Sequence, residues 1–182
     1  MKRKDFEHVL RAAAEIVDDE LVVIGSQAIL GQFPDAPESL LLSLEVDLYP
    51  RNHPERAHEI DGASGDGSRF HGTFDYYAHG VGPETPKAPA GWEARLVPVE
   101  VPASSAKDGP VKAWCMEVHD LVLAKLAAGR PHDLEFVEGV IRSSLVDLEQ
   151  LQLGVELMPE SHRQLTRDLL TGVIAKISRR TN

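Results

Sequence analysis

The chain opens with a hydrophobic pattern that predicts a helix from Asp5 to Asp18. Apolar residues recur there at steps of three and four, as one stripe of a helix requires: Phe6, Val9, Leu10, Ala13, Ile16 and Val17. A continuous apolar run rich in β-branched side chains follows from Leu21 to Ile24 and predicts a strand covered on both faces. Gly25-Ser26 ends that strand, and a short helix is expected from Ser26 to Phe33 before a proline-rich stretch.

The next segments alternate with a period of two, which predicts further strands. From Ser43 to Tyr49 the apolar side chains point to one face and two carboxylates to the other. Further strands are predicted over Phe70–Ala78 and Arg95–Val101, the second at a sheet edge because its proline cannot donate to the ladder. Loops rich in Gly, Ser, Asp or Pro are expected over Asp61–Ser68 and Pro83–Gly91.

The second half of the chain is predicted to be helical. Proline opens two of its four helical patterns, as expected at a first helical position. The patterns cover Glu117–Ala128, Pro131–Leu145, Asp147–Leu153 and Pro159–Ser178. The sequence therefore predicts an α/β (α+β) fold, in which residues 1–113 form a mixed β-sheet with flanking helices. Residues 114–182 form a helical region that completes the site and packs on this core as one compact unit.

Composition narrows the class of protein. No apolar run approaches the roughly 20 residues that span a bilayer, so we expect a cytoplasmic protein with no membrane partner. Cys115 is the only cysteine, which excludes an internal disulfide framework and leaves a small core side chain as its role. The net charge of -10 argues against a broad nucleic-acid-binding surface, because such surfaces cluster Lys and Arg. A nucleoside triphosphate remains compatible with this charge, since divalent metal ions bridge carboxylates to phosphates.

The first candidate for chemistry is the turn at Gly25-Ser26, between the predicted strand and the short helix. The missing side chain of Gly25 lets a phosphate approach, and the N–H groups at the start of a helix attract it. A simpler interpretation is that Gly25 only permits a tight turn from strand to helix.

Glu45 and Asp47 are the second candidate. Residues two apart in a strand point to the same face, and adjacent carboxylates repel unless a cation lies between them. We therefore predict that both bind a divalent metal ion and that Asp47 is catalytic, although the pair could instead line the solvent face of an edge strand. In nucleotidyl transfer, such ions hold the triphosphate, help to ionise the acceptor hydroxyl and neutralise the leaving pyrophosphate. The sequence leaves open whether Asp75, Glu100 or Asp133 supplies a third ligand.

Lys125 and Asp133 are further candidates, because both lie on the inward face of a predicted helix. A buried ammonium needs an anion or a path to water, so Lys125 either meets a carboxylate or phosphate or extends to solvent. Asp133 could instead complement the dipole of its own helix at the first turn. Arg130 could pair with a phosphate or with an acid such as Glu135.

These residues resemble the hallmark of the DNA polymerase beta-like nucleotidyltransferase superfamily. There, a hydrophobic strand ending in Gly-Gly or Gly-Ser precedes a strand with an acid-x-acid pattern. The matching segments here are Val22–Ser26 and Leu44–Leu48, and the run Asp120–Asp133 looks like the lysine and later aspartate of the AbiEii-like toxin branch. The resemblance implies a nucleotidyltransferase-like fold over roughly Leu21 to Leu145.

Membership of that branch would imply Mg2+ or Mn2+ as cofactor and an NTP as donor, with Gly25, Ser26, Lys125 and Arg130 around the nucleotide. The acceptor would be a hydroxyl of RNA, in some relatives a tRNA end, or of a protein. Some members pair with an antitoxin, so a cognate antitoxin is an expected partner. Because Glu45 stands where Asp is more usual, the alternative is a catalytically inactive scaffold that binds a nucleotide or a partner protein.

Overall fold

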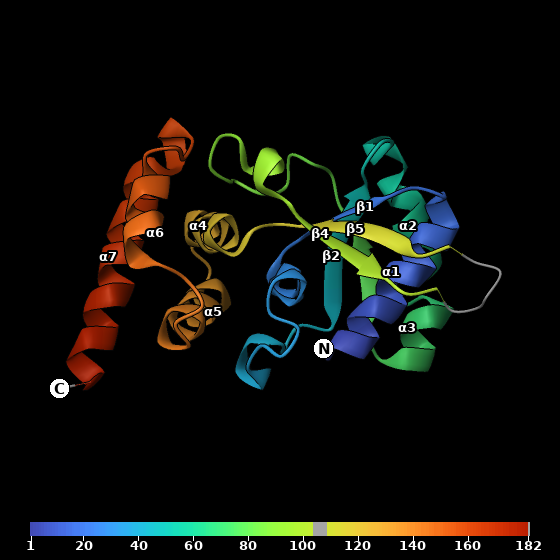
Figure 1. Cartoon of the computed structure of the whole chain (residues 1–182), viewed down its shortest axis with the longest axis horizontal. Helices are drawn as coiled ribbons and strands as arrows, with labels where there is room; N and C mark the ends of the chain where they lie inside the picture. The colour runs from blue at the N-terminus through green and yellow to red at the C-terminus, as the bar shows by residue number, and fades with distance from the viewer. Residues whose placement is uncertain (104–108, 182) are drawn as a thin grey trace.

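The computed structural model describes residues 1–103 and 109–181 and contains a five-stranded sheet (Figure 1). The strands are β1 (Leu21–Ile24), β2 (Glu45–Pro50), β3 (Tyr77–Gly80), β4 (Val97–Val101) and β5 (Val111–Cys115). Their order in space is β3-β2-β1-β5-β4, so β4 lies at an edge as predicted. The sheet is mixed: β1 runs antiparallel to β2 but parallel to β5, β2 runs parallel to β3, and β4 runs antiparallel to β5.

The helices lie on and beside this sheet. The α-helices are α1 (Arg3–Val17), α2 (Ala57–Ser64), α3 (Arg69–Phe74), α4 (Val118–Ala128), α5 (Pro131–Arg142), α6 (Leu148–Val155) and α7 (Glu160–Thr181). Short 3-10 segments are η1 (Ser26–Gly31), η2 (Glu38–Leu40), η3 (Pro54–Arg56) and η4 (Trp92–Arg95). The predicted α/β class, with a mixed sheet, flanking helices and a C-terminal helical region, is confirmed.

The two faces of the sheet are covered differently. α1 packs on the sheet through the apolar stripe that its sequence predicts, and α2 packs beside it on β2 and β3. Val46 and Leu48 of β2 are fully buried on this side. Residues directly opposite one another on paired strands share a face. The pairs Ile24–Asp47 and Asp47–His79 therefore place the acidic side of β2, with His79 beside it, on the other face of the sheet.

Helices α4 to α7 form the end of the molecule away from α1, α2 and α3 (Figure 1). α4 follows β5 and packs against η1, which brings it next to the turn at Gly25. One hydrophobic cluster of buried side chains runs from α1 through the sheet into α4, α5, α6 and α7. The division expected between residues 113 and 114 falls inside β5, and this cluster extends across it.

Two predictions between β2 and β3 are wrong. The loop predicted over Asp61–Ser68 is helical as far as Ser64, where α2 ends, and most of the strand predicted over Phe70–Ala78 is α3. The hydroxyl of Ser68 explains the second difference, because it accepts the backbone N–H of His71 at 3.1 Å and caps the start of α3. The strand itself begins only at Tyr77.

The sequence pattern also fails to predict β5 as a strand. This strand has only five residues, and Lys112 interrupts its apolar run. Cys115 ends it and is fully buried, as expected for a core side chain, and burial raises the pKa of its thiol to about 12.

Within residues 1–103 and 109–181, no helix combines the length and the apolar character that crossing a bilayer requires.

Candidate functional site

The candidate site lies at the end of the sheet where β1 finishes and β2 begins. Asp47 Oδ1 lies 2.8 Å from Nδ1 of His79, which stands directly opposite it on β3. The hydroxyl of Tyr77 donates a hydrogen bond of 3.0 Å to Oε2 of Glu45. One ligand atom from each of Glu45, Asp47 and His79 lies within 4.8 Å of the other two. Two carboxylates and an imidazole therefore converge on one small volume.

Asp47 is held in an environment that disfavours its charge. Burial raises the pKa of Asp47, while the hydrogen bond from His79 acts in the opposite direction. The charge of Glu45 raises this pKa further, and the charges of His79 and Lys125 lower it, which leaves the pKa above its ordinary value. A cation placed between the two carboxylates would remove this penalty.

Tyr77 keeps its proton next to the pair. Burial and the hydrogen bond to Glu45 raise the pKa of Tyr77 to about 12, so the hydroxyl acts as a donor at neutral pH. That donation occupies one oxygen of Glu45 and fixes the orientation of the carboxylate.

Gly25 is required by two independent features of its position. Its backbone has φ 68° and ψ -173°, a region that is essentially restricted to glycine. A Cβ atom there would also collide with the carboxylate of Asp47. The backbone of the turn therefore packs directly against the acid, which a side chain at position 25 would prevent.

The residues after Gly25 connect this turn to β2. Ser26 begins η1, so the predicted short helix is present as a 3-10 segment. Gln27 is buried, and its Nε2 donates to the carbonyl oxygen of Ser43 at 3.0 Å. The hydroxyl of Ser43 in turn accepts the backbone N–H of Glu45 at 3.2 Å. Gln27 and Ser43 thus fix the turn relative to the first acid of β2.

Lys125 and Asp133 meet each other inside the helical region. Lys125 Nζ lies 2.6 Å from Oδ1 of Asp133, and Arg130 Nε lies 2.7 Å from Oδ2. Asp133 is fully buried and Lys125 is 8% exposed. Burial acts to raise the pKa of Asp133, but the hydrogen bonds and charges of Lys125 and Arg130 outweigh it and leave the pKa lowered. The charge of Lys125 also acts to lower the pKa of Asp47, which links this ion pair to that carboxylate.

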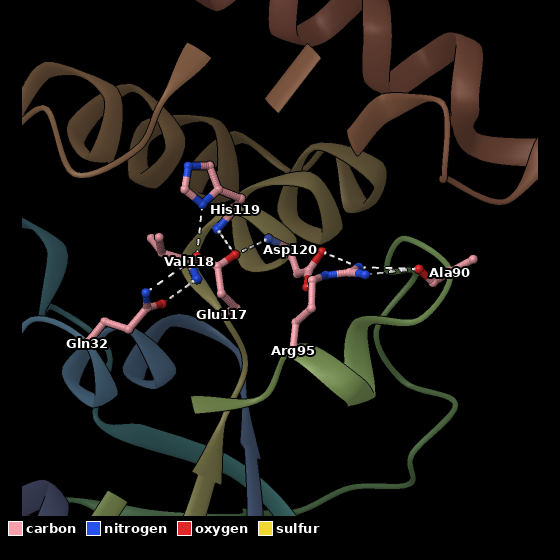
Figure 2. Close-up of polar contacts among 7 residues, drawn as sticks. All are labelled: Gln32, Ala90, Arg95, Glu117, Val118, His119 and Asp120. Carbon is pink, nitrogen blue, oxygen red and sulfur yellow. Dashed lines mark hydrogen bonds and ion pairs between the residues drawn. The ribbon is translucent and has the colours of Figure 1, made fainter. Parts of the chain in front are cut away.

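The first turn of α4 is anchored to the segment that follows Gly25. Figure 2 shows the side chain of Glu117 accepting the backbone N–H of His119, at 2.8 Å. Gln32, which directly follows η1, accepts the backbone N–H of Val118 at 2.6 Å (Figure 2). Two orphan N–H groups at the helix start are satisfied in this way, and the helix that carries Lys125 is fixed beside the turn.

A second anchor joins α4 to the segment before β4. Arg95 donates to both oxygens of Asp120, each at 2.8 Å, and its guanidinium also contacts the carbonyl of Ala90 (Figure 2). The N–H of Ala90 donates to the carbonyl of Leu157 at 2.8 Å, between α6 and α7. The segment between β3 and β4 therefore bridges the sheet and the helical region.

The acids proposed as a third ligand do not join Glu45 and Asp47. Glu100 lies on β4, three strands from β2, which at the usual strand spacing is about 14 Å away. Asp75 caps the C-terminus of α3 in a left-handed conformation. Asp133 is engaged by Lys125 and Arg130. Over the described residues, His79 is the side chain that completes a group of three potential ligands.

His79 is the residue that the sequence pattern misses. The predicted strand ends at Ala78, two residues before the end of β3 at Gly80, so it leaves His79 out. The available signal was the alternation Tyr77, Ala78, His79, in which both polar residues face the same way.

The residues present fit a divalent metal ion. Carboxylate oxygens suit ions such as Mg2+ and Mn2+, imidazole nitrogen suits transition-metal ions such as Zn2+, and the three ligand atoms are close enough to share one ion.

Substitution of Gly25 by alanine should destabilise the fold, because the methyl group meets both a strained backbone conformation and the Asp47 carboxylate. The strained backbone conformation of a non-glycine residue at this position alone costs about 1–3 kcal/mol. Urea denaturation measures the decrease in the free energy of unfolding. Gly62→Ala in α2 is the matched control: no atom lies within 4 Å of its added Cβ, and its stability should stay the same or rise. Equal effects of the two substitutions would contradict the packing of Gly25 against Asp47.

Substitution of Asp133 by asparagine should lower the free energy of unfolding by about 3–5 kcal/mol at neutral pH, because it leaves the Lys125 ammonium buried without its anion. Lys125→Met should lower the free energy of unfolding by less than Asp133→Asn does, since Arg130 still pairs with Asp133.

The difference in the free energy of unfolding between the wild type and Asp133→Asn should depend on pH. The pKa of Asp133 is lowered in the folded state. The ionised carboxylate therefore contributes its full stabilisation at pH values above the ordinary pKa of 3.8, and this stabilisation is lost as the pH falls through the lowered pKa. Urea denaturation at pH 7 and near pH 3 checks this. A difference in unfolding free energy that is larger near pH 3 than at pH 7 would contradict the ion pair between Lys125 and Asp133.

The chain can be compared with known proteins at this point. A family model described as a nucleotidyltransferase of unknown function (DUF6036) matches residues 4–168. No curated protein and no solved structure matches the chain.

Proposed function

Since the chain belongs to this DUF6036 family of nucleotidyltransferases, we propose that it transfers a nucleotide from an NTP to a hydroxyl group with the help of a divalent metal ion. The observation that carries the proposal is the convergence of Glu45, Asp47 and His79 beside Gly25. A triphosphate needs positive charge around it, and this cluster can hold a metal ion that supplies it.

Each residue of the cluster has a proposed role. Glu45 and Asp47 hold the cation, Mg2+ or Mn2+, which when bound neutralises phosphate charge and lowers the pKa of the acceptor hydroxyl. Gly25 and Ser26 leave room for the donor phosphates beside Asp47. The acceptor oxygen forms a bond to the α-phosphorus, the bond from that phosphorus to pyrophosphate breaks, and Asp47 takes up the hydroxyl proton.

Basic residues of the helical region help to offset the negative charge of the NTP phosphates. The side chain of Arg130 is 62% exposed while it contacts Asp133, so it can turn toward a phosphate without leaving a buried site. Lys125 acts through its field on Asp47 and the triphosphate, and Asp133 holds Lys125 in place.

The acceptor is proposed to be a hydroxyl of RNA, such as a tRNA end, or of a protein. The net charge of -10 favours an acceptor held locally over one bound along a broad surface. A role as the toxin of a toxin–antitoxin pair, with a cognate antitoxin as partner, is a further proposal from the resemblance to the AbiEii-like branch.

A second candidate function is nucleotide or partner binding without transfer. The observation in its favour is that polar groups of the site already have partners in the free protein: Tyr77 donates to Glu45, and Lys125 is paired with Asp133. Calorimetry separates the two functions, because binding that needs no metal and releases no pyrophosphate would favour the scaffold.

Asp47→Asn should abolish transfer. Incubation of the purified protein with each labelled NTP, Mg2+ or Mn2+, and total RNA or lysate protein should label an acceptor. Loss of the metal ligand should lower the rate by at least about 100-fold, since metal ions supply several kcal/mol of transition-state stabilisation. The same substitution removes a disfavoured buried charge, so the melting temperature of the metal-free protein should not fall.

Glu100→Gln is the matched control, because it neutralises an exposed acid on β4 far from the cluster and should leave transfer unchanged. Equal labelling by wild type and Asp47→Asn, or no labelling by wild type with any NTP and either ion, would overturn the enzymatic proposal.

A further inference from the structure

The metal site contains one ligand of a different chemical kind. Glu45 and Asp47 offer carboxylate oxygens, whereas His79 offers an imidazole nitrogen. His79 stands directly opposite Asp47 in the ladder between β2 and β3, so the strand register fixes the backbone of His79 beside Asp47. A metal ion bound at Asp47 and Glu45 therefore lies within reach of this nitrogen, since the three ligand atoms are within 4.8 Å of one another.

From this donor set we infer that the site selects Mn2+ over Mg2+, with His79 as a metal ligand. The inference rests on the proposed function in taking the cluster as a metal site, and it adds which ion the site prefers. Mg2+ is a hard ion that favours oxygen ligands and retains its waters. Mn2+ is a transition-metal ion, the first in the Irving–Williams order, and it binds imidazole nitrogen alongside carboxylate oxygens more readily than Mg2+ does.

The hydrogen bond between His79 and Asp47 strengthens this preference. Its atoms are 2.8 Å apart, which leaves no room for a cation between them, so an ion that engages both groups must replace that bond. Mn2+ compensates for the lost hydrogen bond by bonding to the nitrogen, whereas Mg2+ compensates for it poorly. The imidazole is free to adjust, because its side chain is 47% exposed.

The preference can be measured on the protein alone, without nucleotide or acceptor. Free Mn2+ gives an electron paramagnetic resonance signal that falls when the ion binds, and added Mg2+ reverses the loss in proportion to its own affinity. For the wild type we expect Mn2+ to bind at least about tenfold more tightly than Mg2+.

Three substitutions define the role of His79. His79→Asp replaces nitrogen by oxygen and should bring the ratio of the two affinities below about threefold while Mn2+ still binds. His79→Ala should weaken Mn2+ binding by at least about tenfold. His58→Asp makes the same chemical change on α2, outside the cluster, and should retain the wild-type ratio.

The outcomes separate this inference from the proposed function. Equal affinity of the wild type for both ions, an unchanged ratio in His79→Asp, or no binding of Mn2+ at millimolar concentration would overturn the inference even if nucleotide transfer is found. A strong Mn2+ preference that disappears in His79→Asp would support it even if no acceptor is ever labelled. Circular dichroism of each variant shows that the compared proteins are folded.

Discussion

The repulsion between Glu45 and Asp47 is the constraint on which the rest of the site depends. The alternation of a β-strand places both carboxylates on one face, and burial raises the pKa of Asp47 above its ordinary value. The neighbouring contacts all act on this pair: Tyr77 donates to Glu45, His79 contacts Asp47, and the backbone of Gly25 packs against the Asp47 carboxylate. The sheet therefore keeps a charge arrangement that is unfavourable in the free protein and that a bound cation relieves.

The helical region compensates for part of this charge from the other side. Lys125 would be costly to bury alone, but Asp133 pairs with it and Arg130 completes the group. A buried ion pair adds little net stability compared with apolar residues, so its value here lies in orientation. It holds an ammonium close enough to act on Asp47, while Gln32, Arg95 and their partners fix α4 against the sheet.

The sequence predicts those features that depend on neighbours along the chain. The stripe of α1, the alternation of β2 and the inward positions of Lys125 and Asp133 follow from local periodicity, and the structure shows each of them. His79 could not be found in this way, because its place beside Asp47 depends on a strand register between residues 32 positions apart. The error at Phe70–Ala78 has a local cause: aromatic residues favour strands, but the Ser68 cap starts a helix.

The proposed function requires an acidic protein to accept a still more acidic ligand. Without a cation, the triphosphate would approach Glu45 and Asp47 in a chain of net charge -10, which is unfavourable at short range. The hydrogen bond from Tyr77 keeps the Glu45 carboxylate in place, whereas an ion that engages both Asp47 and His79 has to replace the hydrogen bond between those two side chains. Under the proposed function, binding of the metal ion and binding of the nucleotide are expected to be coupled, because the ion offsets the negative charge of both the carboxylates and the phosphates.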